Sequence, residues 1–93
     1  MSGSERSRSR TIFVGGEDPN AYALRAIVML REAGEDEVVI IKGRGENISK
    51  AIDIYNEIKE RLGDGLKLVG VSIGSEKSGK RKVSYIEISL KLA

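Results

Sequence analysis

Residues 38–52 read VVIIKGRGENISKAI. The continuous apolar run at its start, Val38–Ile41, is typical of a buried strand. The basic, glycine-spaced residues 42–45 then predict a tight loop, followed by a helix that begins near Asn47. The first N–H groups of a helix lack partners within it and carry partial positive charge. Because glycines let an anion approach the backbone, this stretch predicts a phosphate-binding loop.

The polar and glycine residues of this stretch are the candidate anion ligands. They are Lys42, Gly43, Arg44, Gly45, Asn47 and Lys50. The alternative is a tight strand–helix connection whose cations are only solvated. Lys50 is the weakest member, because a lysine in the first turn opposes the helix dipole and simple exposure would explain it equally well.

The chain has 93 residues, 40% of them apolar, which suits one small domain with a modest core. It contains no cysteine and no histidine, which excludes disulfides, thiolate metal sites and histidine acid–base chemistry. We therefore expect no metal and no cofactor. No stretch is long and apolar enough to span a membrane, and MSGSERSRSR at the start lacks the apolar centre of a signal peptide. A cytoplasmic protein without a membrane partner is expected.

The net charge of +2 is unevenly distributed. Positive charge gathers in residues 1–10, 40–50 and 75–93, whereas residues 11–39 are acidic, so a polyanion would meet three separate basic regions. Residues 1–10 are expected to form a disordered basic tail, and residues 11–93 the folded domain. Within the tail, Arg6, Arg8 and Arg10 either add affinity for nucleic acid or only keep the chain soluble.

The order of elements predicts a two-layer α/β sandwich, βαβαββ, with a four-stranded mixed sheet and two helices on one face. The expected strands are 11–14, 38–41, 66–75 and 81–92, and the expected helices are 19–33 and 47–62. In the second helix Ile54 lies beside the main apolar stripe and widens it. We therefore expect a second apolar surface, covered by another subunit and made by Ile54, Ile58 and Leu62.

Residues 76–80 predict the turn of a long β-hairpin whose tip is strongly basic. The cations there are Lys77, Lys80, Arg81 and Lys82. So many neighbouring cations repel one another, which favours a basic arm that lies along a nucleic-acid groove. The alternative is a solvated loop whose lysines protect a sheet edge.

The residues IKGRG at 41–45, followed by ISKAID at 48–53, resemble the Alba family of archaeal chromatin proteins, over about residues 11–92. Residues 53–65 are similar to its second, more divergent paralogue type. The resemblance implies a fold like that of the C-terminal domain of translation initiation factor three. It also implies a dimer, built through the second helix and last strands, that binds double-stranded DNA and often RNA with little sequence preference. The implied location is the archaeal chromosome, with Lys42, Arg44 and Lys50 on the central surface.

Three positions depart from the family pattern. Gly16 and Glu17 stand where many members carry a lysine pair, one of which is acetylated. Glu46 stands where a basic residue is common, so it should repel phosphate unless it pairs with Arg44 or Lys50. Leu62 replaces an aromatic residue that often joins neighbouring dimers.

The sequence leaves two other function classes to consider. An enzyme with a Ser49–Lys50 pair is disfavoured, because adjacent helix residues point about 100° apart and no Walker motif or carboxylate cluster is present. We therefore predict a protein without enzymatic activity. The other class is a protein scaffold, or a heterodimer partner that modulates a more basic Alba paralogue or binds RNA instead of packaging DNA alone.

Overall fold

The computed structural model describes residues 8–93 of the chain. The elements are β1 (Arg8–Phe13), α1 (Pro19–Glu32), β2 (Glu37–Arg44), α2 (Asn47–Leu62), the short 3-10 helix η2 (Gly63–Gly65), β3 (Leu66–Ser78) and β4 (Arg81–Leu92). This order confirms the predicted βαβαββ arrangement.

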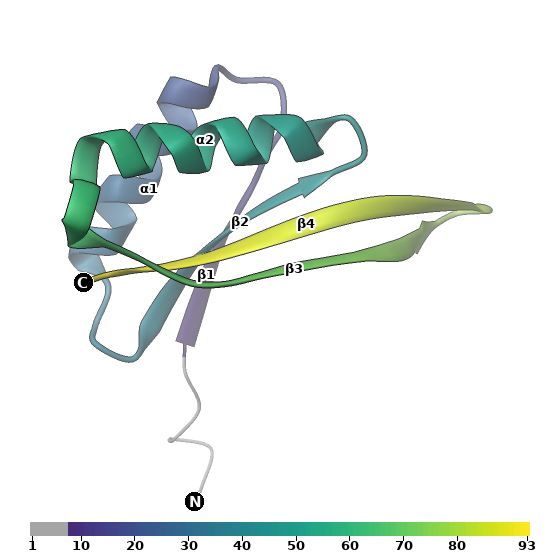
Figure 1. Ribbon diagram of the computed structural model, residues 1–93. Coiled ribbons are helices and arrows are strands. Elements are labelled where there is room, and N and C mark those ends of the chain that lie inside the picture. Colours follow the sequence, from purple (N-terminus) through teal and green to yellow (C-terminus); the bar gives the residue numbers. More distant parts are fainter. Residues whose placement is uncertain (1–7) are drawn as a thin grey trace, which may run out of the picture.

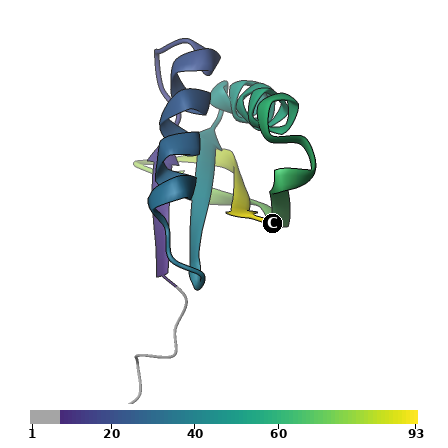
Figure 2. The ribbon, with the colours of Figure 1, turned by 90° about the vertical axis from the view of Figure 1, so that its left-hand side faces the viewer.

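The sheet has the order β1-β2-β4-β3 (Figure 1). The crossover through α1 makes β1 and β2 parallel, whereas β4 is antiparallel to both of its neighbours, so the sheet is mixed. In Figure 2, α1 runs alongside β1 and β2 while α2 is seen almost end-on, so the two helices cross on the sheet. Strands β1 and β3 are the two edge strands of the sheet.

The core lies between the helices and one face of the sheet. Side chains alternate along a strand, so Val39 and Ile41 of β2 enter the core while Lys42 and Arg44 belong to the helix-free face. Ala51, Ile54 and Ile58 of α2 close the core from the other side. The remaining buried apolar residues are Ile12, Val14, Tyr22, Ala23, Ala26, Ile27, Leu30, Leu66, Ile86, Ile88 and Leu90.

The burial of α2 corrects the predicted dimer surface. Ile54 and Ile58 are 0% exposed, because they are the residues that α2 inserts into the chain's own core. They therefore cannot form a surface for another subunit. Leu62 is half-buried and packs against the same core. Ile52 of the same helix is 43% exposed.

The predicted tail boundary is also wrong at its C-terminal end. Residues 8–10 belong to β1, where they pair with residues 37–39 of β2. The side chain of Arg10 forms an ion pair with Glu32 at the end of α1, at 3.5 Å. Pairing to β2 gives this segment backbone hydrogen bonds that its polar composition did not suggest. Arg6 and the rest of the predicted tail lie outside the described residues.

Candidate functional site

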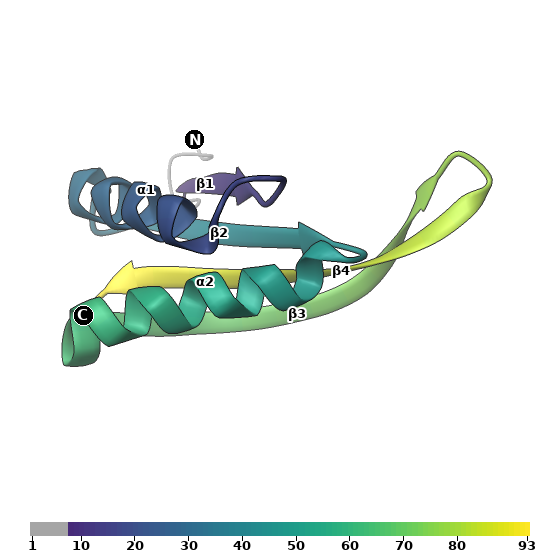
Figure 3. The ribbon, with the colours of Figure 1, turned by 90° about the horizontal axis from the view of Figure 1, so that it is seen from above.

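Strands β3 and β4 form a hairpin that projects beyond the N-terminal end of α2 (Figure 3). The pairing continues to Ser78 and Arg81, so the turn is only Gly79-Lys80 rather than the predicted residues 76–80. Gly79 has a φ of 65° and no non-glycine residue among residues 8–93 has a positive φ. A two-residue turn with positive φ only at its first position is of type II′, which matches the twist of hairpin strands.

The four predicted arm cations all lie at the tip of this hairpin and are exposed. Lys77 and Lys82 are directly opposite each other across the two strands, and Arg81 begins β4 next to the turn. Within residues 8–93 none of the arm cations forms an ion pair. Like charges directly opposite one another destabilise a hairpin, so this concentration costs stability unless an anion approaches.

The central cations lie at the base of the arm, on the helix-free face. Lys42 Nζ is 3.0 Å from Glu76 Oε1 and 3.4 Å from Glu87 Oε2. Arg44 Nε is 3.0 Å from Glu76 Oε2. The Lys42 ammonium also lies 4.6 Å from the centroid of the Tyr85 ring. The predicted cations are therefore brought together, but as part of an ion-pair network.

The network stabilises the charged form of Lys42. Its hydrogen bond with Glu76 raises the pKa of Lys42 above the usual 10.5, with a further contribution from Glu87, while burial acts in the opposite direction. Lys42 is therefore fully protonated at neutral pH. Glu46 is not part of this network and, among the described residues, pairs with neither Arg44 nor Lys50.

Gly43, in β2, and Gly45, in the loop after it, each have a structural reason for their position. A Cβ atom on Gly43 would overlap the backbone of Asn47 and lie 2.9 Å from Ala51 Cβ, so Gly43 lets the start of α2 pack on β2. Gly45 has a φ of 55°, which favours glycine. The Gly45 N–H donates to the Ser84 carbonyl oxygen at 2.8 Å, so it is not a free anion ligand.

Lys50 has a structural partner that the sequence did not suggest. Its Nζ donates to the carbonyl oxygens of Gly15, at 2.7 Å, and Glu17, at 3.0 Å. The Gly15 N–H donates to the buried Tyr22 hydroxyl at 2.7 Å. The β1–α1 loop, where the family pattern places a lysine pair, is therefore held from both helices. Lys50 thus bonds to the β1–α1 loop, whereas Lys42 and Arg44 pair with carboxylates of β3 and β4.

Several residues around the central cations were not among the predicted site residues: Glu76, Tyr85, Glu87 and Phe13. Glu76 was placed in a turn, although strand pairing puts it on β3 opposite Val83, within reach of both central cations. Phe13 is exposed and lies next to Lys42 on the helix-free face, since the two are paired between β1 and β2. The in–out alternation of Ile12 and Phe13 could have identified this residue.

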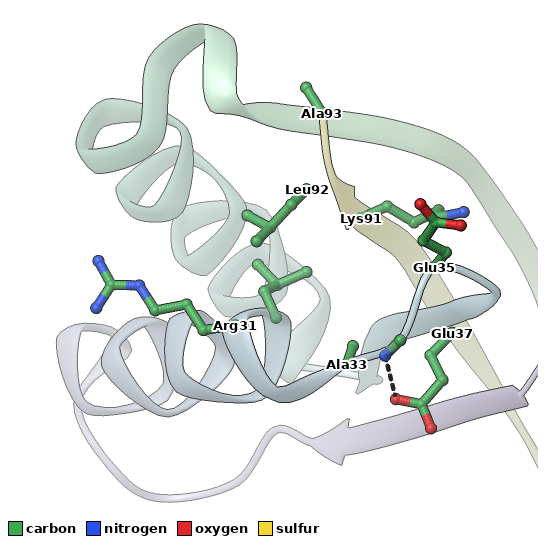
Figure 4. Close-up of a pocket in the computed structure, with 9 residues that line it drawn as sticks. Arg31, Ala33, Glu35, Glu37, Lys91, Leu92 and Ala93 are labelled. Atoms are coloured by element: carbon green, nitrogen blue, oxygen red, sulfur yellow. Dashed lines mark hydrogen bonds between the residues drawn. The ribbon is translucent and has the colours of Figure 1, made fainter.

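A pocket of about 510 Å³ lies at the end of the sheet away from the arm (Figure 4). It is lined by residues of both charges, among them Arg31, Glu35 and Lys91, and by none of the predicted site residues. The Gly34 N–H donates to Glu37 Oε1 beside it, at 3.1 Å. Within the described part of the chain, no group of three or more carboxylates could hold a metal ion, and no helix is long and apolar enough to cross a membrane.

The class of protein is a small two-layer α/β domain that combines central cations on β2 with a projecting basic β3–β4 hairpin. The model of the family described as Alba matches residues 10–75. The chain belongs to the Alba family.

Relatives of known sequence agree with this assignment. The chain is 52% identical over 65 residues to the DNA/RNA-binding protein Alba 2 of Saccharolobus solfataricus, covering 70% of this chain and 72% of the relative. It is 40% identical over 86 residues to the DNA/RNA-binding protein Alba of Nanoarchaeum equitans, covering 85% and 93%. The structure of Alba from Thermoplasma volcanium superimposes with a TM-score of 0.76 at 30% identity, covering 88% of this chain and 99% of that one.

Proposed function

We propose that the chain binds the sugar–phosphate backbone of double-stranded DNA, and of RNA, without sequence preference, and that it coats the chromosome as a dimer. The single observation that carries this proposal is the hairpin tip, where Lys77, Lys80, Arg81 and Lys82 are exposed without ion-pair partners among the described residues. Such a charge concentration is stabilised when phosphates replace solvent beside it. The names of the relatives, which are DNA/RNA-binding proteins, support the same ligand class.

The dimer is proposed on β3, one of the last strands that the family resemblance implies, and not on Ile54 and Ile58, which are buried. Edge strand β3 carries a row of exposed apolar side chains, Leu68, Val71 and Ile73, and Ile73 is 76% exposed. Edge strands with exposed apolar residues are usually protected or covered, because unpaired backbone groups there recruit other chains. A second copy on β3 would cover this row and would place two arms on one assembly. A heterodimer with another Alba chain would use the same surface.

The proposed function is tested by measuring duplex affinity against salt concentration. For a backbone binder, log affinity falls linearly with log salt, with a slope of roughly −0.9 for each phosphate contacted, and scrambled duplexes bind alike. The variant Lys80→Gln/Arg81→Gln/Lys82→Gln should bind all sequences more weakly, and its slope should be shallower by up to about 2.7, or about 0.9 per cation.

The matched control removes three cations from the two helices, with Arg25→Gln, Arg31→Gln and Lys59→Gln. It should weaken binding less than the arm variant. Equal losses in the two triple variants would reject the arm as the contact surface. Absence of duplex binding at low salt would reject the function itself. Parallel titrations with duplex RNA and single strands compare the two nucleic acids directly.

A further inference from the structure

The Glu76 carboxylate bridges the two central cations. Oε1 accepts from Lys42 Nζ and Oε2 lies beside Arg44 Nε, each at 3.0 Å. One anion therefore offers one oxygen to each cation, which is how the two non-bridging oxygens of a backbone phosphate meet a pair of cations. Glu76 comes from β3 and reaches β2 from across β4, which lies between them.

The network leaves little free charge at the centre of the helix-free face. Lys42 and Arg44 carry two positive charges, and Glu76 and Glu87 carry two negative charges at 3.0–3.4 Å from them. A phosphate approaching this region meets a neutral cluster, unlike the arm tip. Lys42 Nζ faces both carboxylates and is only 15% exposed, so a phosphate can contact Lys42 and Arg44 together only if a carboxylate is displaced.

Glu76 is the carboxylate whose departure frees both central cations. It lies on edge strand β3 and contacts both of them, whereas Glu87 lies on β4 between two paired strands and contacts only Lys42. The side chains of Glu76 and Glu87 are 35% and 34% exposed, so exposure allows Glu76 to rotate into solvent but does not distinguish it from Glu87. The pairs that it forms are partly exposed, and such pairs are individually weak.

We propose that Glu76 occupies the position of a backbone phosphate in the free protein, and that nucleic acid binds at Lys42 and Arg44 by exchange with this carboxylate. This inference rests on the proposed function and identifies the phosphate subsite and the residue that limits its affinity. At the arm tip, none of the described carboxylates pairs with the cations, so none has to be displaced by a phosphate. Binding at the centre therefore follows arm contact and adds to it only after Glu76 is displaced.

The test compares Glu76→Gln with Glu35→Gln in the full chain. Glutamine keeps the size of the side chain, and both variants change the net charge equally, but Glu35 lies in the turn between α1 and β2, beside the pocket of Figure 4. Glu76→Gln should bind duplex DNA about threefold to tenfold more tightly than the wild type. Its salt slope should be steeper by about 0.9, for one added phosphate contact. Glu35→Gln should stay near the wild type.

Equal affinities for the two variants would overturn the exchange, since net charge alone would then explain any change. Weaker binding by Glu76→Gln would overturn it too, because the carboxylate would then position the cations for the ligand. Failure of the wild type to bind any duplex at low salt rejects the proposed function, which is a different outcome. In that case inorganic polyphosphate still tests the subsite: tighter binding by Glu76→Gln supports exchange, and equal binding rejects it.

Discussion

The Cα of Gly43 lies against α2 so closely that a Cβ atom there would be 2.9 Å from Ala51 Cβ. The same atom would overlap the backbone of Asn47. The contact joins the end of β2 to the start of α2, and thus fixes where the central cations stand relative to the core.

The first prediction follows from this contact. Gly43→Ala should lower the free energy of unfolding by about 1–3 kcal/mol or more, because a backbone neighbour must move to admit the methyl group. Denaturant unfolding followed by circular dichroism measures the loss. Gly16→Ala is the control, since nothing lies within 4 Å of a Cβ there and its φ is not positive. A loss as large for Gly16→Ala would contradict the packing explanation.

A second prediction separates the role of Lys50 from that of the other cations. Lys50→Met removes the donor to the Gly15 and Glu17 carbonyl oxygens and should lower the free energy of unfolding by about 1–2 kcal/mol. Lys59→Met removes the same charge from an exposed site on α2 and should change it little. The duplex affinities of the two variants should be alike. A selective loss of affinity in Lys50→Met would contradict this assignment and show that Lys50 contributes to binding.

The third prediction concerns the β3 surface and uses two valines of nearly equal exposure. Val71 on β3 is 54% exposed and Val28 on α1 is 53% exposed. Val71→Glu should shift the protein from dimer to monomer in sedimentation equilibrium, because a buried carboxylate without a partner is costly. Val28→Glu should leave the mass unchanged. A wild type that is monomeric at tens of micromolar, or dissociation by both variants, rules out this interface.

The fold could be predicted from the sequence because the residues that begin and end its helices are clear. Pro19 follows Asp18 at the start of α1, and Gly63 ends α2 with a φ of 52°, as glycine stops predict. The unbroken apolar run of β2 and the alternation of β4 placed both strands. By contrast, the start of β1 was missed, because Arg8–Arg10 carry no apolar signal and gain their order from pairing with β2.

The candidate site was predicted less completely, since its ion pairs join distant parts of the chain. Lys42 and Glu76 are 34 residues apart, and only the register of β3 on β4 brings them together. Spacing along α2 could not decide whether Ile54 faced the core, because either side of the helix was apolar enough to be buried. The arm cations were the easier prediction, because they are neighbours in sequence and need no tertiary contact to form a cluster. Their role in binding stays a prediction.

The two-residue turn at Gly79-Lys80 has one more consequence. Because the backbone ladder runs from the body of the sheet to the last residues before the turn, the hairpin is already ordered when the chain is alone. The proposed contact with a polyanion would therefore cost little chain entropy, unlike contact through a loose lysine-rich segment. The strand pairing thus sets the spacing between the cations at the tip and those at the base before the proposed ligand arrives.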